Sequence, residues 1–216
     1  CYLRLDKPHW AQRLVDAGYR TGYFGKWHVE RTNQLEDFGW QVNGVAGGEI
    51  YKAKVAEVVQ DREWKWHIQK ELTEPPGYNV GKLYGVHNIP PEERKMGVIC
   101  SCALDFLDDV MGKDEPWCCF VSVPEPHDPF MVGKDAFNLY DVDSIELPPN
   151  LHDELAGRPG IYRKAARVWQ HMTDREHREA AACYWALNTE IDQQFGRVLK
   201  TIEDAGELDK TLIVMT

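Results

Sequence analysis

The run at residues 117–123 (WCCFVSV) constrains the fold most, because it is apolar at nearly every position. A strand with one face in water alternates apolar and polar side chains, whereas a strand buried on both faces does not need to alternate. Burial on both faces is typical of a parallel sheet that is covered by helices. The run therefore predicts a strand inside an α/β fold.

Helices and strands are expected to alternate along the chain. Each of three predicted helices is followed by a short apolar or aromatic strand, and glycine or proline separates the elements. The predicted pairs are helix 8–17 with strand 19–24, helix 91–109 with strand 117–123, and helix 173–205 with strand 211–215. A capping box at Thr173 and Glu176 marks the start of the third helix. This order predicts an α/β fold with a largely parallel sheet flanked by helices.

The rest of the chain is less regular. Residues 32–90 are polar, dotted with tryptophan and interrupted by glycine and proline, and we expect one helix there at about residues 53–70. The chain starts at Cys1 rather than methionine and stops directly after an apolar run. We therefore expect residues 1–216 to be the central part of a single domain, with a less regular excursion at about 32–90 and an incomplete sheet at both ends.

Composition excludes several classes of protein. The formal net charge is −10 and no basic run is present, which argues against a nucleic-acid partner. No apolar run approaches the roughly 18 residues of a membrane span, so none is expected. Five of the six cysteines fall in strand-like and helical patterns, which favours buried thiols over a disulfide framework or a zinc site. Localisation and oligomeric state are left open.

Polar residues follow two of the predicted strands at their carboxyl ends. Lys26 and His28 follow strand 19–24, and His127 with Asp128 follows strand 117–123 in a proline-rich loop. Ligands of parallel sheets bind at this edge. A lysine and two histidines offer N–H donors and positive charge that suit sulfate or phosphate, and histidine exchanges protons with a pKa of about 6.5.

These residues predict a hydrolase or transferase that acts on an anionic ester. The structural alternative is that the lysine is a solvated rim residue and that the histidines only stabilise loops. Trp64, Trp66 and His67 have a similar pair of interpretations. They could line a substrate subsite or simply bury apolar area as part of an inserted helix that covers the core.

Three segments resemble the sulfatase family. Residues 18–28 (GYRTGYFGKWH) are similar to its second signature, residues 126–130 (PHDPF) to its middle histidine loop, and residues 184–216 to the helix and strand before its later metal loop. The resemblance implies an alkaline-phosphatase-like fold. It also implies hydrolysis of a sulfate ester by a formylglycine residue beside a calcium ion.

The resemblance assigns a role to each matching residue. Lys26 would bridge the sulfate and the formylglycine oxygen, and so would be both catalytic and substrate-binding. His28 would accept the formylglycine proton. His127 would contact the sulfate and help to protonate the leaving alcohol. Asp128 matches no catalytic position of the family, and we expect it to orient the loop instead.

The sequence also departs from the family. Cys1 is followed by Tyr-Leu-Arg-Leu, which does not match the Cys-x-Pro/Ala-x-Arg motif that becomes formylglycine. The acidic pairs that hold the metal are absent as well. We therefore expect the residues for calcium and formylglycine to lie outside this chain, with no metal ligand inside it. The chain alone should be inactive, and the full-length enzyme should act on a small-molecule or carbohydrate sulfate ester.

Two other functions stay open. A pocket of lysine and histidine does not distinguish sulfur from phosphorus, so a phosphonate or phosphate ester hydrolase of the same superfamily is the first alternative. The second is a non-catalytic pseudoenzyme that only binds an anion.

Overall fold

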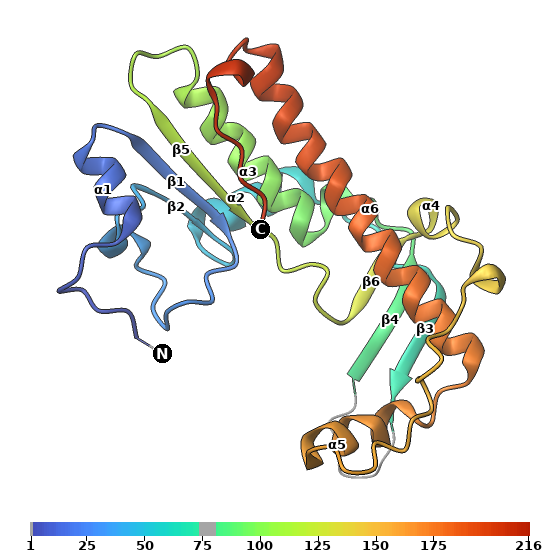
Figure 1. Cartoon of the computed structure of the whole chain (residues 1–216). Helices are drawn as coiled ribbons and strands as arrows, with labels where there is room; N and C mark the ends of the chain where they lie inside the picture. The colour runs from blue at the N-terminus through green and yellow to red at the C-terminus, as the bar shows by residue number, and fades with distance from the viewer. Residues whose placement is uncertain (1, 74–80) are drawn as a thin grey trace. The chain divides into compact units, whose positions relative to one another are not determined.

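A computed structural model of the chain describes residues 2–73 and 81–216 (Figure 1). Contacts within it divide the chain into two compact units. Unit 1 consists of residues 1–61, 90–124 and 191–216, and unit 2 of residues 62–89 and 125–190.

Unit 1 contains a three-stranded parallel sheet. Its strand order is β2 (Val42–Val45), β1 (Arg20–Gly25) and β5 (Trp117–Ser122), with β1 in the centre. Gly25 is in register with both Val45 and Ser122, so the three carboxyl ends meet at one edge. The predicted α/β fold with parallel strands is confirmed.

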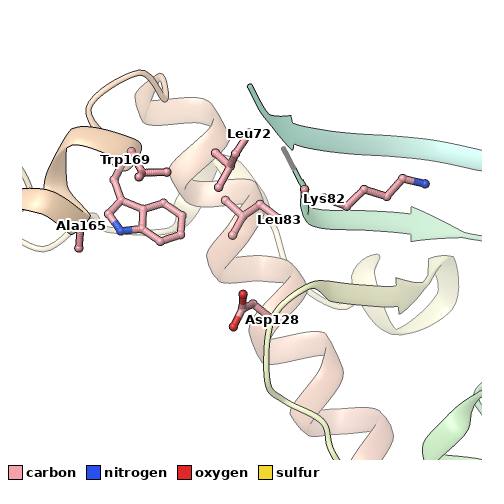
Figure 2. A pocket seen from close by; sticks show the side chains of 8 residues that line it. Leu72, Lys82, Leu83, Asp128, Ala165 and Trp169 are labelled. Carbon is pink, nitrogen blue, oxygen red and sulfur yellow. The ribbon is translucent and has the colours of Figure 1, made fainter. Parts of the chain in front are cut away.

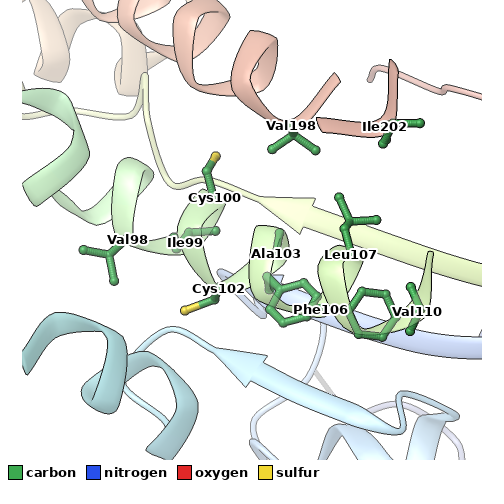
Figure 3. Packing of buried hydrophobic residues seen from close by; sticks show 11 residues of the cluster. Val98, Ile99, Cys100, Cys102, Ala103, Phe106, Leu107, Val110, Val198 and Ile202 are labelled. Carbon is green, nitrogen blue, oxygen red and sulfur yellow. The ribbon is translucent and has the colours of Figure 1, made fainter. Parts of the chain in front are cut away.

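Alternate side chains of β1 and β5 enter two separate apolar clusters. Phe24 and Cys119 pack with α3 (Lys95–Val110), and Val198 and Ile202 of α6 (Asp174–Asp204) join the same cluster (Figure 3). On the other side, Tyr23 and Cys118 pack with α1 (Trp10–Asp16) and a 3₁₀ turn at Leu35–Phe38. Helical segments therefore cover both faces of the sheet.

The prediction of complete burial for residues 117–123 was wrong in degree. The other side chains of this segment are only half-buried, and Phe120 is 38% exposed. The physical reason is its place in the sheet. Among the described residues, β5 pairs with β1 on one side alone, so only part of its surface is covered.

Unit 2 contains a three-stranded mixed sheet. β3 (Trp66–Leu72) runs antiparallel to β4 (Gly81–His87), which is parallel to β6 (Phe130–Gly133). The first half of α6 is bonded to all three strands. The bonds are a 2.6 Å ion pair from Lys70 to Glu176, a 2.7 Å hydrogen bond from Tyr84 Oη to Glu179, and a 3.1 Å bond from Gly133 N to Glu190 Oε1.

Shorter elements complete the two units. They are the helices α2 (Glu49–Val58), α4 (Lys134–Phe137) and α5 (Gly160–Trp169), and the 3₁₀ turns Pro91–Glu93, Val142–Ser144 and Leu208–Lys210. Within the described ranges, no helix is both long enough and apolar enough to cross a membrane.

The start of α6 follows the predicted capping box. Thr173 N donates to Glu176 Oε2 at 2.8 Å, and Glu176 N donates to Thr173 Oγ1 at 3.3 Å. These two bonds satisfy amides that a helix start otherwise leaves without partners. The predicted helix is confirmed and runs for 31 residues.

Two predicted elements were wrong. The helix expected at about residues 53–70 ends at Val58, and β3 begins at Trp66, because alternate residues from Trp66 onward become half-buried against a neighbouring strand. The strand expected at residues 211–215 is not formed. It has no strand partner in the described part of the chain, and Leu212 is 88% exposed.

The described cysteines are free thiols. Cys100, Cys102 and Cys183 are buried, whereas Cys118 and Cys119 are half-buried. Burial raises the pKa of both Cys102 and Cys118 to about 11. These two side chains therefore stay protonated at neutral pH, which agrees with the predicted thiols. Cys1 lies outside the described residues.

The close approach of β1 and β5 requires glycine at position 25. Gly25 has φ +112°, and a Cβ added there would lie 2.0 Å from the carbonyl oxygen of Ser122. A non-glycine residue would therefore be strained both by its backbone conformation and by contact with the next strand.

We expect Gly25→Ala to lower the free energy of unfolding by about 2–4 kcal/mol. Gly18→Ala is the matched control, since Gly18 has φ +86° but no atom within 4 Å of its added Cβ. It should cost only about 1 kcal/mol. Denaturant titration of both variants checks this, and equal losses would contradict the proposed contact with Ser122.

Glu207 connects the region after α6 to the start of β5. Its carboxylate accepts hydrogen bonds from Gly112 N at 2.8 Å and from Trp117 Nε1 at 2.9 Å. The Gly112 amide first, and then the Trp117 indole, lower the pKa of this carboxyl. A carboxyl with a lowered folded-state pKa stabilises the fold above its unfolded pKa of about 4.3, and this contribution is lost as pH falls through the folded value.

Glu207→Gln should therefore be less stable than the wild type by about 1 kcal/mol at pH 7, and the difference should shrink below about pH 4. Glu115→Gln, which changes an exposed carboxylate, serves as the control. Thermal unfolding between pH 7 and pH 3 gives the comparison. A difference that does not depend on pH would show that the charge of Glu207 is not responsible.

Candidate active site

Lys26 is held by the main chain at the carboxyl end of β1. Its amide donates to Ser122 O at 2.7 Å, and its carbonyl oxygen accepts a 2.5 Å hydrogen bond from Tyr23 Oη. Tyr23 is itself buried, and this burial raises the pKa of its hydroxyl. Lys26 therefore starts from a rigid position directly beside the end of β5.

Trp27 anchors the loop between the two candidate site residues of unit 1. Its ring packs edge-on against Tyr23 at a centroid distance of 5.1 Å and lies 5.7 Å from Phe38. Lys26 is half-buried and His28 is exposed, as expected for residues on either side of such an anchor. No described residue forms an ion pair or side-chain hydrogen bond with Lys26 Nζ or the His28 ring, so both side chains can contact a ligand.

His127 lies in unit 2, in the loop before β6, and its ring is held by the next residue. The Nδ1 atom is 2.7 Å from Asp128 O and 3.0 Å from Asp128 Oδ1. A carbonyl and a carboxylate oxygen only accept hydrogen bonds, so Nδ1 must carry the hydrogen. His127 is 65% exposed, and this arrangement leaves its Nε2 atom for a substrate.

The three candidate residues fall into different units. Lys26 and His28 belong to unit 1, and His127 belongs to unit 2. Their convergence on one anion stays a prediction. The sequence interpretation gave Asp128 a role in orienting the loop but missed its contact with the imidazole, although a carboxylate directly after a histidine was the available signal.

Calcium is not accommodated by the described residues. Among them, no group of three or more His, Cys, Asp or Glu side chains could hold a metal ion. The expectation that the calcium ligands and the formylglycine lie outside this chain stays a prediction.

The tryptophans of β3 and the segment before it pack on their own sheet. The rings of Trp64 and Trp66 lie 4.8 and 5.4 Å from that of the buried His87, and the ammonium of Lys82 lies 4.2 Å from the Trp66 ring centroid. These contacts favour a covering role for Trp64 and Trp66, although Trp66 lies on a strand and not on the expected helix. His67 is exposed on the same strand.

Comparisons with known proteins find sulfatase relatives. The model of the sulfatase family matches residues 6–216. The uncharacterized sulfatase YidJ of Escherichia coli K12 is 27% identical over 194 residues, which cover 87% of this chain and 36% of that protein. A choline-sulfatase of Rhizobium meliloti is 24% identical over 225 residues, covering 96% of this chain and 41% of that protein.

A solved structure shares the fold. The phosphonate monoester hydrolase of Agrobacterium radiobacter superposes with a TM-score of 0.66 at 18% identity, covering 98% of this chain and 47% of that one. This likeness confirms the predicted alkaline-phosphatase-like fold. The chain spans less than half the length of these relatives. Because the family model matches almost every residue, the chain belongs to the sulfatase family.

Proposed function

We propose that the complete protein hydrolyses a sulfate ester and that this chain supplies Lys26, His28 and His127 to the site. The observation that carries the proposal is the 2.7 Å hydrogen bond between Lys26 N and Ser122 O, which joins the carboxyl ends of β1 and β5. His127 follows Ser122 by five residues. Chain connectivity alone keeps its Cα within about 18 Å of that of Ser122.

The proposed roles follow from the free donors. The ammonium of Lys26 stabilises the negative charge of the sulfate group, and this stabilisation matters most as charge builds up in the transition state. His127, protonated on Nε2, donates that proton to the alcohol oxygen as its bond to sulfur breaks. His28, which follows β1 as Lys26 does, is the proposed proton acceptor. Water supplies the oxygen that remains on the released sulfate.

Asp128 acts through His127 in this proposal. Its carboxylate and carbonyl oxygens hold the Nδ1–H, which directs Nε2 away from the loop and stabilises the ring once it carries two protons. Asp128 is therefore a positioning residue. The rest of the site, including the calcium ion and formylglycine that the resemblance implies, is proposed to come from sequence outside residues 1–216.

We also propose which part of the enzyme this chain forms and what the enzyme acts on. Residues 1–216 are the central part of one catalytic domain and are inactive alone, and the substrate is a small-molecule or carbohydrate sulfate ester. A phosphonate or phosphate ester hydrolase is the alternative, because the same donors suit either tetrahedral anion. A pseudoenzyme that binds sulfate without hydrolysing it is a second alternative.

The first test compares an aryl sulfate with an aryl phosphonate as substrates of the full-length enzyme. We expect the sulfate to have the higher kcat/KM, and Lys26→Ala to reduce that value by about 10²–10³-fold. Lys113→Ala is the control, since Lys113 is an exposed lysine paired with Asp109. Faster turnover of the phosphonate would favour the alternative, and an active Lys26→Ala enzyme would contradict the assignment.

The second test removes the carboxylate beside His127. Asp128→Ala keeps the main-chain acceptor, so we expect kcat to fall by only about 10-fold, with a larger loss for esters of poorly acidic alcohols. Asp135→Ala changes another exposed aspartate of unit 2 and should leave kcat unchanged. Nitrogen NMR of the His127 ring should show hydrogen on Nδ1 in the wild type and a mixture of tautomers in Asp128→Ala. The same tautomer in both proteins would exclude the positioning role.

A further inference from the structure

Unit 2 contains a pocket to which the proposed reaction assigns no role. Its volume is about 220 Å³. Segments from β3, β4, the His127 loop and α5 form its walls (Figure 2). The lining residues are Leu72, Gly81, Lys82, Leu83, Asp128, Ala165, Val168 and Trp169.

The pocket has one apolar wall and one polar group. Figure 2 shows the indole ring of Trp169, from α5, turned toward Leu72 and Leu83 of the two strands, and Trp169 remains 39% exposed. The Asp128 carboxylate enters the same space. Lys82 contributes only its stem, because its ammonium lies over the Trp66 ring at 4.2 Å. Asp128 is therefore the single charged group that the lining residues present to a ligand.

We propose that this pocket binds the alcohol half of the substrate and that this half is a single uncharged sugar ring. The inference rests on the proposed function. Asp128 connects the two sites, since its Oδ1 lies 3.0 Å from His127 Nδ1 and its side chain also lines the pocket. An alcohol bound here would contact the carboxylate that holds the ring of His127, the proposed proton donor.

The lining residues favour a sugar ring as the ligand of this pocket. The C–H face of a pyranose ring is apolar and packs flat on an indole, and its hydroxyl groups can donate to the free oxygen of Asp128. The pocket is smaller than the roughly 300–1,000 Å³ of pockets for drug-sized ligands, which fits one ring rather than an oligosaccharide.

Two other occupants fit less well. A second sulfate or a carboxylate on the alcohol would be repelled by Asp128. A quaternary ammonium alcohol is typically held by a cage of several aromatic rings, whereas Trp169 is the single aromatic residue among those that line the pocket. A monosulfated monosaccharide is therefore the favoured substrate class.

The experiment uses the full-length enzyme with N-acetylglucosamine 6-sulfate. Trp169→Ala removes the stacking surface, and Ala165→Arg places a large side chain at an exposed lining position. Each variant should raise KM at least 10-fold and change kcat less than threefold. Inorganic sulfate, used as a competitive inhibitor, should keep its inhibition constant within twofold, because it occupies the anion site alone. Unchanged KM in both variants would overturn the proposal.

Trp64→Ala is the matched control, because Trp64 is a half-exposed tryptophan of unit 2 that does not line the pocket. It should leave KM unchanged. Ala165→Arg also distinguishes loss of the pocket from misfolding. It replaces an exposed alanine, so a raised KM in this variant as well as in Trp169→Ala points to the pocket.

A second measurement separates this proposal from the proposed function. If the wild type hydrolyses neither this ester nor the aryl sulfate, sulfatase activity fails, but saturation-transfer NMR with free N-acetylglucosamine still tests the pocket. Transfer that is lost in Trp169→Ala and kept in Trp64→Ala supports the sugar site, and equal transfer in both overturns it. Turnover of choline sulfate with a KM that depends on Trp169, together with no sugar binding, would overturn the monosaccharide assignment.

Discussion

The hydrogen-bonded register between β1 and β5 determines where the candidate site begins. Gly25 and Ser122 are paired, and the next amide, that of Lys26, bonds to the Ser122 carbonyl oxygen at 2.7 Å. This contact is possible because Gly25 has no Cβ, which would otherwise lie 2.0 Å from the same oxygen. The position of the lysine is therefore a consequence of how closely two backbones approach.

The same register depends on the core beneath it. Phe24 alternates with Tyr23 along β1, so one ring packs against α3 and the other against α1 and Trp40. A shift of one residue would exchange these two faces and would place both rings in the wrong cluster. Burial on both sides of β1 thus stabilises the alignment of the strand ends, and through it the start of the loop that carries Lys26 and His28.

Asp128 combines two roles in the proposed enzyme. One carboxylate oxygen faces His127 Nδ1, and the side chain also enters the pocket beside Trp169. A single residue would then orient the acid that protonates the leaving alcohol and also select which alcohol binds. This coupling suits an exposed loop, because a carboxylate in water keeps its charge without a buried partner.

Much of the fold was determined by the sequence alone. Local patterns predicted α1, β1, α3, β5 and α6, because helix periodicity, glycine stops and the Thr173 capping box act over short distances. The segment GYFGKWH also predicted a cation and an imidazole directly after a buried strand. Lys26 and His28 do follow β1 directly, although the role of these residues stays a proposal.

Only the tertiary structure decided the remaining features. Residues 66–72 become a strand because β4 lies beside them, whereas residues 211–215 have a strand composition but no strand partner within the described residues. The contact of Asp128 with the His127 ring and the pocket shared with Trp169 depend on side-chain direction and on segments far apart in the chain. Sequence patterns record which residues prefer burial or extension, but pairing and pocket walls depend on what the folded chain places next to them.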